Sequence, residues 1–364
     1  MHLKAVSQVY NKKQEALMNY LTAEVEKSTY PNIHSILISK GRNIMYEHYF
    51  SGFNKNSLHD SRSSFKSVTS LLIGIAIDKG LIKNVDQKVY TYFPENKQIF
   101  ENDERKKKIT IKNLLEMESG LDCEEFNDTK NCEDNRTTTK DWVKFSLALP
   151  MNNEPGKVWA YTSCNPMIIS GIIRNVAHTS IMNFAKHNLF DPMGITNYKW
   201  TVDSSGNGMT AGSFYIKPRD MLKIGMLVRD DGVYKGKQVV SAKWIKESTT
   251  ATIPIPQFSF VKFSKSKIAF PQPTNYGYYW YNERLKTKKL SENIVFASGN
   301  GGQYIMIIKS LDLVVVFTQG NYGIWKAKQA FDILAKYIIP AFGHKKNQKC
   351  KNSFLVKYKL LKKK

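Results

Sequence analysis

The feature that most constrains the fold is the placement of strand-like segments at both ends of the sequence, with a helix-rich block between them. Residues 34–50 read HSILISKGRNIMYEHYF, two β-rich runs around a Lys-Gly-Arg-Asn turn, and this pattern predicts a hairpin. The last third contains four more strand candidates, at 276–281, 293–299, 302–310 and 311–319. We therefore predict an α+β fold: an antiparallel sheet built from both chain ends with flanking helices, plus a mostly helical inserted region.

The helical segments are predicted from apolar spacing. Phe65, Val68, Leu71, Leu72 and Ile75 share one helical face, and Gly80 marks the end of that helix. Other helices are predicted at 14–28, 110–121, 165–178, after Pro218 and at 324–342. The expected organisation is a helical extension at 1–30, a single domain at 31–342 whose helical subregion spans about 62–200, and a basic tail at 343–364.

The charge distribution argues against a dedicated nucleic-acid binder. The formal charge is +23, yet residues 344–364 alone hold nine lysines and no acidic residue, and the remaining basic residues are scattered. No zinc-finger spacing or RNA-binding aromatic string is present. We expect no specific nucleic-acid partner, and a solvated tail suited to weak contact with anionic surfaces. The sequence gives no prediction of the oligomeric state.

The chain has no run of 18 uncharged apolar residues, so no transmembrane helix is expected. Its first residues lack the apolar core of a secretory signal, which predicts a cytoplasmic protein, or a periplasmic or secreted one if an N-terminal signal is missing. The four cysteines do not have zinc-site spacing. Cys123 and Cys132 flank a polar loop and could pair in an oxidising compartment, and Cys164 is interpreted as a buried filler.

A candidate nucleophile stands where the helix at residue 65 begins. Ser63 precedes Lys66 by three residues, a spacing that places both side chains on one helical face. Serine becomes a nucleophile when a neighbour accepts its proton, and lysine can do so when burial keeps it neutral. The alternative is that Ser61, Ser63 or Ser64 simply caps the helix.

Two other segments could complete a site. Tyr161 follows a Pro-Gly turn and precedes a helix, and near a lysine ammonium its phenolate would be favoured, although a core tyrosine is the simpler interpretation. The segment 296–307 reads FASGNGGQYIMI, where glycines before a strand allow a close approach of the backbone to a substrate carbonyl. An ordinary turn would explain it equally well.

Taken together, these segments resemble the serine β-lactamase and penicillin-recognising superfamily, in its class C-like branch of esterases, D-amino-acid peptidases and 6-aminohexanoate-dimer hydrolases. The resemblance lies in DSRSSFKSVTSLLIGIAIDKGLI, ITIKNLLEMESGLDC, PGKVWAYTSCNPMIISGII, PRDMLKIGMLV, YGYYWY and SGNGGQYIMI, which occur in the family order between about residues 30 and 342. It implies a β-lactamase/transpeptidase-like fold and no metal or organic cofactor.

The resemblance also implies residue roles. Ser63 would be the acylated nucleophile, with Lys66 and Tyr161 sharing general-base and general-acid duty. The backbone N–H groups of Ser63 and Gln303 would form the oxyanion hole. Substrate-binding positions would be those of the glycine motif and the position two residues after the tyrosine: Asn300, Gly301, Gly302 and Ser163.

Two departures from the family pattern bear on substrate choice. Ser163 stands where β-lactamases usually carry Asn, and Asn300 stands where they usually carry Lys or His. A buried cation there would be worth about 1.5–3 kcal/mol to an anionic lactam. We expect a serine hydrolase, an esterase or amidase acting on a small ester, amide or short peptide through an acyl-enzyme, rather than an efficient β-lactamase. The alternative is a catalytically weak module that binds a peptide or cell-wall fragment.

Overall fold

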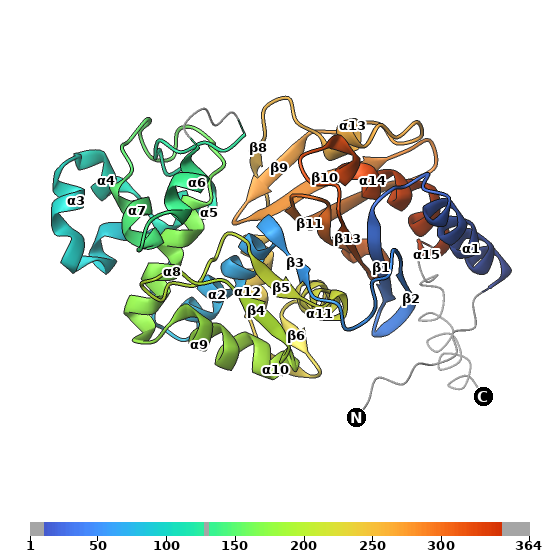
Figure 1. Cartoon of the computed structure of the whole chain (residues 1–364), viewed down its shortest axis with the longest axis horizontal. Helices are drawn as coiled ribbons and strands as arrows, with labels where there is room; N and C mark the ends of the chain where they lie inside the picture. The colour runs from blue at the N-terminus through green and yellow to red at the C-terminus, as the bar shows by residue number, and fades with distance from the viewer. Residues whose placement is uncertain (1–10, 127–130, 344–364) are drawn as a thin grey trace, which may run out of the picture.

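The computed structural model describes residues 11–126 and 131–343, so the basic tail lies outside it except for Gly343. An eight-stranded sheet dominates one half of the molecule, and a helical block forms the other half (Figure 1). Both chain ends contribute to the sheet, as predicted, because β1 pairs with β13 from Ile33↔Gln319 to Lys40↔Leu313. The strands lie in the order β2 (Asn43–Tyr49), β1 (Ile33–Lys40), β13 (Leu313–Gln319), β12 (Gln303–Ile308), β11 (Ser291–Gly299), β10 (Trp280–Lys286), β9 (Thr274–Gly277) and β8 (Ile253–Pro254).

Helices cover both faces of the sheet. In β12, Ile305 lies against Gly225 of α11 (Pro218–Arg229), while its neighbour Tyr304 contacts Phe331 of α14 (Gln329–Ile333) with ring centroids 5.6 Å apart. Successive strand residues point to opposite faces, so α11 and α14 lie on opposite sides. Every residue of β12 and β13 is consequently buried, and alternation of polar and apolar residues is absent from both strands.

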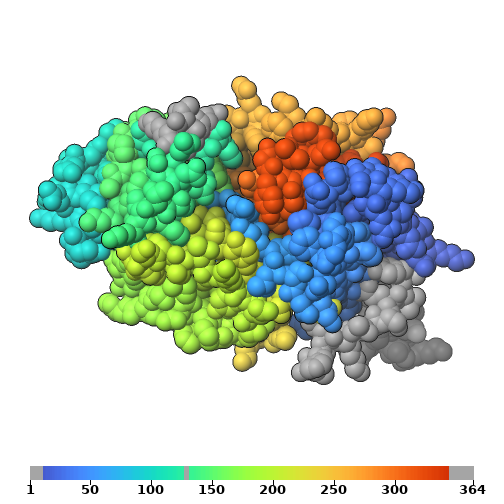
Figure 2. Space-filling model, viewed as in Figure 1, coloured from blue at the N-terminus to red at the C-terminus, as the bar shows by residue number. Residues whose placement is uncertain are grey.

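The two ends of the chain also meet outside the sheet. The predicted N-terminal helix is α1 (Lys12–Glu26), whose buried face includes Leu21 and which packs on the C-terminal helices, with Tyr20 and Tyr337 centroids 5.9 Å apart. In the space-filling view the N-terminal segment, in blue, and the C-terminal segment, in red, lie side by side (Figure 2). Helix α1 is therefore packed on the domain, and residues 1–10 of the expected 1–30 extension lie outside the described residues.

The helical block is built around α2 (Phe65–Asp78). Its expected apolar face exists, but Lys66, Ser67 and Thr69 on the other side are buried too, because neighbouring elements surround the helix. Gly80, with φ +73°, follows the helix end as predicted. Of the neighbouring helices, α8 (Cys164–Ala177) and α12 (Ala242–Ser248) pack on α2. The other elements of the helical block are η2 (Val89–Tyr92), η3 (Pro94–Asn96), α3 (Lys97–Glu101), α4 (Glu104–Lys108), α5 (Ile111–Leu115), α6 (Cys132–Thr137), α7 (Trp142–Ala148), α9 (Ile181–Ala185), η4 (Lys186–Phe190) and α10 (Asp191–Met193).

Three sequence-based boundaries were wrong for local backbone reasons. The helix expected at 110–121 stops at Leu115, because Met117 has φ +60°, which an α-helix does not tolerate. The strand expected at 276–281 is a hairpin, since Tyr278 and Tyr279 have φ of 45° and 69°. The closing helix at 324–342 is broken into η6 (Trp325–Lys328), α14, the π-helical η7 (Leu334–Ile338) and α15 (Ile339–Phe342).

The remaining elements are short. Near the start of α2 lies a small sheet of β3 (His59–Asp60), β5 (Phe214–Ile216) and β4 (Tyr198–Trp200). Elsewhere lie the paired strands β6 (Val233–Tyr234) and β7 (Lys237–Gln238), the helix α13 (Phe260–Ser264) and the 3₁₀ turn η5 (Lys309–Leu311). Among the described helices, none is both long and apolar enough to cross a membrane.

Candidate active site

The three clustered serines have different environments. They lie at η1 (Arg62–Ser64), the 3₁₀ turn that leads into α2. Ser64 Oγ is buried and donates to the Ser61 carbonyl at 2.7 Å, and Ser64, at the N-cap of α2, makes no side-chain cap hydrogen bond. Ser63 is partly exposed, and its Oγ lies 3.0 Å from Lys66 Nζ. The capping interpretation therefore does not account for Ser63.

Lys66 lies fully inside the protein, and its ammonium nitrogen contacts oxygens on three different elements. Nζ is 3.0 Å from Ser63 Oγ, 3.1 Å from Ser163 Oγ and 3.2 Å from the carbonyl oxygen of Ala211. Burial lowers the pKa of Lys66 below its ordinary value, although the nearby Glu125 carboxylate opposes this. The neutral form of the amine is thus more populated here than in water, as a general base requires.

Tyr161 covers the lysine. Lys66 Nζ lies 4.7 Å from the centre of its ring, and the Tyr161 hydroxyl interacts with the hydroxyls of Ser63 and Tyr281. Burial, reinforced by the negative charge of Glu125, raises the pKa of Tyr161 well above its ordinary value. The expectation that the lysine favours a phenolate was therefore wrong, because burial and the Glu125 charge both raise the Tyr161 pKa and so favour the phenol.

The glycine motif lies against the nucleophile turn. A Cβ on Gly299 would be 2.4 Å from the Ser61 carbonyl oxygen, so the end of β11 approaches η1 directly. Gly301 and Gly302 have φ of +86° and +97°, and Gly302 N–H donates to the Gly299 carbonyl at 3.1 Å. These glycines are needed for a tight turn that brings the first residue of β12, Gln303, towards Ser63.

The side chains at this turn face other partners. Gln303 is buried and donates through Nε2 to the Gln319 carbonyl at 2.5 Å, so its side chain already has a partner within the protein. Asn300 is exposed, and its Oδ1 accepts the Gly323 N–H at 2.9 Å. The side-chain NH₂ of Asn300 is left as the donor that a substrate could meet. The oxyanion and substrate-binding roles of these residues stay predictions.

One residue near the nucleophile was missed by sequence reasoning. Glu125 accepts the backbone N–H of Ser163 with Oε1 and its hydroxyl with Oε2 at 3.1 Å, and Glu125 N–H donates to the Tyr161 carbonyl at 2.9 Å. Burial raises the pKa of Glu125. Nothing in the acidic loop sequence distinguishes Glu125 from Glu124, because the interaction spans 38 residues of chain.

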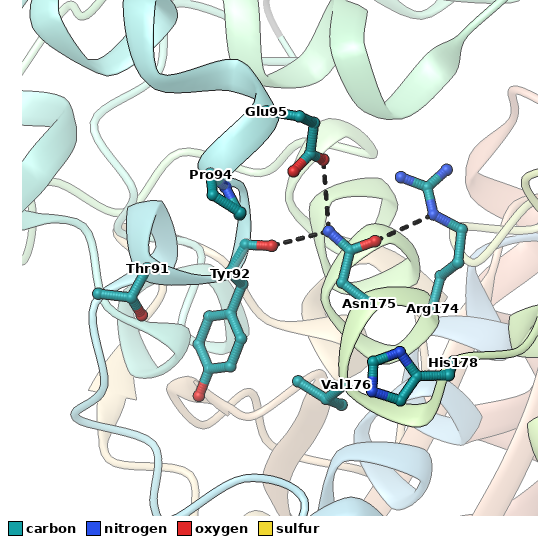
Figure 3. A pocket seen from close by; sticks show the side chains of 8 residues that line it. All are labelled: Thr91, Tyr92, Pro94, Glu95, Arg174, Asn175, Val176 and His178. Atoms are coloured by element: carbon teal, nitrogen blue, oxygen red, sulfur yellow. Dashed lines mark hydrogen bonds between the residues drawn. The ribbon is translucent and has the colours of Figure 1, made fainter.

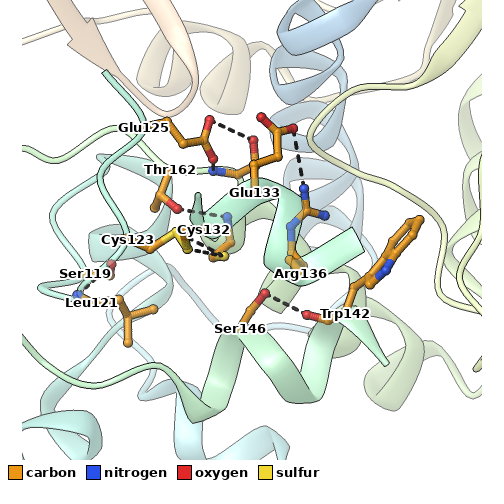
Figure 4. Close-up of a disulfide and its surroundings, with 12 residues drawn as sticks. Ser119, Leu121, Cys123, Glu125, Cys132, Glu133, Arg136, Trp142, Ser146 and Thr162 are labelled. Atoms are coloured by element: carbon orange, nitrogen blue, oxygen red, sulfur yellow. Dashed lines mark hydrogen bonds and ion pairs between the residues drawn. A yellow bond between two sulfur atoms is a disulfide. The ribbon is translucent and has the colours of Figure 1, made fainter. Parts of the chain in front are cut away.

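A sulfur cluster lies behind Glu125. Cys123 and Cys132 form a disulfide, the pairing considered from the sequence, and Figure 4 shows it beside Glu125, Glu133 and Arg136. Cys164 is buried, as expected, with its sulfur 3.6 Å from that of Cys123. The three sulfurs lie within 4.8 Å of one another, but the disulfide withholds two of them from any metal.

Aromatic side chains line one side of the site. Phe126 stacks on Tyr161 with centroids 4.9 Å apart and is 54% exposed, and Phe258 continues the stack at 6.4 Å from Phe126. Trp159 packs edge-on against Tyr276 at 5.7 Å. We call Phe126, Trp159 and Phe258 the aromatic shelf; it offers an apolar surface next to the reactive hydroxyl.

Other hollows lie away from Ser63. Figure 3 shows a depression of about 420 Å³ between η2 and the C-terminal end of α8, opposite the end that carries Ser163. There, Asn175 Nδ2 donates to the Tyr92 carbonyl at 2.7 Å, and Arg174 Nε donates to Asn175 Oδ1 at 3.2 Å. A cavity of about 600 Å³ lies along α11 and is rimmed by basic residues such as Lys217. Neither contains the Ser63–Lys66 pair.

Comparison with known families assigns the chain. Residues 34–337 match the Beta-lactamase family model, which spans most of the chain. The chain belongs to the beta-lactamase family. This agrees with the resemblance seen in the sequence and with the serine β-lactamase and penicillin-binding-protein superfamily.

One curated relative of this beta-lactamase-family chain is a hydrolase. The 6-aminohexanoate-dimer hydrolase of Paenarthrobacter ureafaciens is 23% identical over 226 residues, 58% of this chain and 56% of that protein. The chain thus matches only about half the length of this curated relative.

Solved structures share the fold. A putative 6-aminohexanoate-dimer hydrolase from Bacillus anthracis has a TM-score of 0.68 and 16% identity, over 86% of this chain and 80% of that one. A family VIII carboxylesterase has a TM-score of 0.68 and 15% identity, over 91% and 98%. The protein therefore has the beta-lactamase fold.

Proposed function

We propose that this protein is a serine hydrolase that cleaves an ester or amide bond through an acyl-enzyme on Ser63. The observation that carries the proposal is the 3.0 Å contact between Ser63 Oγ and the buried Lys66 amine. A hydroxyl paired with a lysine whose pKa is lowered by burial is an activated nucleophile.

Acylation follows from this geometry. Ser63 Oγ attacks the substrate carbonyl while its proton passes to neutral Lys66, and the backbone N–H groups of Ser63 and Gln303 hold the resulting oxyanion. Tyr161, held as a phenol, donates its proton to the leaving oxygen or nitrogen and is reprotonated by the Lys66 ammonium. The carbonyl–heteroatom bond breaks, and Ser63 is left as an ester.

Deacylation reverses these roles. A water molecule attacks the acyl carbonyl, its proton passes to the same lysine–tyrosine pair, and the Ser63 oxygen recovers a proton as it leaves. Over the whole reaction one water molecule is consumed: its hydroxyl ends in the released acid, and its proton replaces the one given to the leaving group. Ser63 and Lys66 return to their starting states.

The surroundings of Ser63 favour an uncharged, partly apolar substrate. The aromatic shelf offers apolar contact, and Asn300 provides an amide where a cation would pair with the carboxylate of a β-lactam. We infer that esters or amides with an apolar group are better substrates than penicillins or cephalosporins. The similarity to a 6-aminohexanoate-dimer hydrolase and to a family VIII carboxylesterase supports the same class.

The test is covalent labelling. A fluorophosphonate probe should add one adduct to the intact mass of the protein, mapped to Ser63, and Ser63→Ala should abolish it. Ser61→Ala and Ser64→Ala are matched controls that should keep labelling. A folded wild-type protein that does not label would instead support the rival function, a module that binds a peptide or cell-wall fragment.

A further inference from the structure

The Lys66 amine has three oxygen partners, and their chemistry decides where its lone pair points. A neutral amine has two N–H donors and one lone pair. The Ala211 carbonyl can only accept a hydrogen bond, so it takes one N–H. If Ser163 Oγ takes the second N–H, the lone pair is left for Ser63, which then donates its proton to Lys66.

Ser163 alone does not guarantee this arrangement, because a hydroxyl can donate as well as accept. Had Ser163 donated to Lys66, it would occupy the lone pair that Ser63 needs. In the structure Ser163 Oγ donates instead to Glu125 Oε2 at 3.1 Å, and the Ser163 backbone N–H donates to Oε1 of the same carboxylate. With its proton held by Glu125, Ser163 Oγ can only accept from Lys66.

We propose that Glu125 is a positioning residue that, by holding the hydroxyl proton of Ser163, aims the lone pair of Lys66 at Ser63. This inference rests on the proposed function in one respect, the role of Lys66 as base. Glu125 itself touches no reacting atom and acts through Ser163.

The position of Glu125 is maintained from two sides. Its N–H donates to the Tyr161 carbonyl at 2.9 Å, which joins its segment to the chain just before Ser163. Two residues earlier, Cys123 is bonded to Cys132 at the start of α6. The carboxylate is therefore held against Ser163 by the backbone rather than reaching it from a free loop.

Glu125 acts on Lys66 through its charge as well as through its hydrogen bonds to Ser163, and these two effects change the basic function of Lys66 in opposite directions. Its charge stabilises the ammonium, which opposes base function, while its hydrogen bonds favour the productive orientation. The groups that face Lys66, apart from the tyrosine ring above it, are Glu125 and Glu133, which raise its pKa, Arg136, which lowers it, and the Cys164 thiol, which raises it. Because burial raises the pKa of Glu125, its protonation at acid pH would release the Ser163 hydroxyl.

The decisive variant is Glu125→Gln, which keeps the shape but replaces the acceptor facing Ser163 Oγ by an NH₂ donor. Ser163 must then turn its own proton towards Lys66. The plateau of kcat/KM for a p-nitrophenyl ester should fall about tenfold or more. The acid limb of the pH profile should move to lower pH, because the carboxylate that raised the Lys66 pKa is gone.

Two controls separate orientation from charge. Glu133→Gln also removes a carboxylate that raises the Lys66 pKa, but no hydrogen bond joins Glu133 to Ser163 among the described residues. It should move the acid limb and leave the plateau within about twofold. In a Ser163→Ala background there is no hydroxyl to orient, so Glu125→Gln should move the limb without lowering the plateau further.

An equal fall of the plateau with and without the Ser163 hydroxyl would overturn the inference. An unchanged plateau in Glu125→Gln, with or without a shift of the limb, would overturn it as well, provided that the thermal transition is that of wild type. Failure of wild type to label at Ser63 would overturn the proposed function instead. In that case a titration of ¹³C-labelled lysine by NMR can still overturn the inference, because an unshifted Lys66 pKa in Glu125→Gln would remove the carboxylate from the network.

Discussion

Replacing Asn300 by lysine tests the account of substrate selectivity. In the structure Asn300 is exposed and its Oδ1 accepts the Gly323 N–H at 2.9 Å. Asn300→Lys adds a cation at the position where the family usually carries one, and it also removes that hydrogen bond. Asn300→Ala removes the same hydrogen bond without adding charge, so it is the matched control.

The structure sets the magnitude. The value of about 1.5–3 kcal/mol for a charged hydrogen bond applies to a buried site. Because Asn300 is exposed, the appropriate range is that of a surface ion pair, about 0.2–1 kcal/mol. We therefore expect kcat/KM for benzylpenicillin, relative to a neutral p-nitrophenyl ester, to rise about 1.4- to 5-fold in Asn300→Lys.

The assay is spectrophotometric turnover of both substrates by wild type and the two variants, at low and high salt. The gain should shrink as salt screens the exposed charge. A wild-type preference for the lactam, an equal gain in Asn300→Ala, or an unchanged ratio in Asn300→Lys would each refute the reasoning. A gain of tenfold or more would show that substrate binding buries this turn.

Three further predictions concern stability. Burial, together with the neighbouring histidine, lowers the pKa of His59 from 6.5 to about 4, so neutral His59 contributes fully to stability above pH 6.5 and this contribution declines towards pH 4. The free energy of unfolding measured in urea should fall by about 3 kcal/mol over that range, and His59→Phe should reduce the fall. A Cβ on Gly74 would lie 2.1 Å from Trp244 Cδ1, so Gly74→Ala should cost about 1–3 kcal/mol in the same assay. Cys123→Ser removes a disulfide that closes a short loop with Cys132 and should cost about 2–3 kcal/mol, after which dithiothreitol should have no further effect; an equal response of wild type and variant to dithiothreitol would contradict the pairing.

Local patterns in the sequence were sufficient for much of the fold. The turn at Gly41 and its β-rich flanks predicted β1 and β2, and Pro218 predicted the start of α11. The positive φ values that ended other elements early, at Met117 and Tyr279, have no such signal, since neither residue is a usual turn former. Those conformations are imposed by packing around them.

The candidate site divides in the same way. The three-residue spacing of Ser63 and Lys66 follows from one helix turn, so the sequence alone determined that this hydroxyl and amine can meet. Whether Lys66 is buried, whether Tyr161 rests as a phenol, and that Glu125 holds Ser163 depend on atoms brought together from distant segments. Desolvation and hydrogen-bond direction are properties of the assembled surroundings, and therefore only the tertiary structure decided the chemistry that the spacing made available.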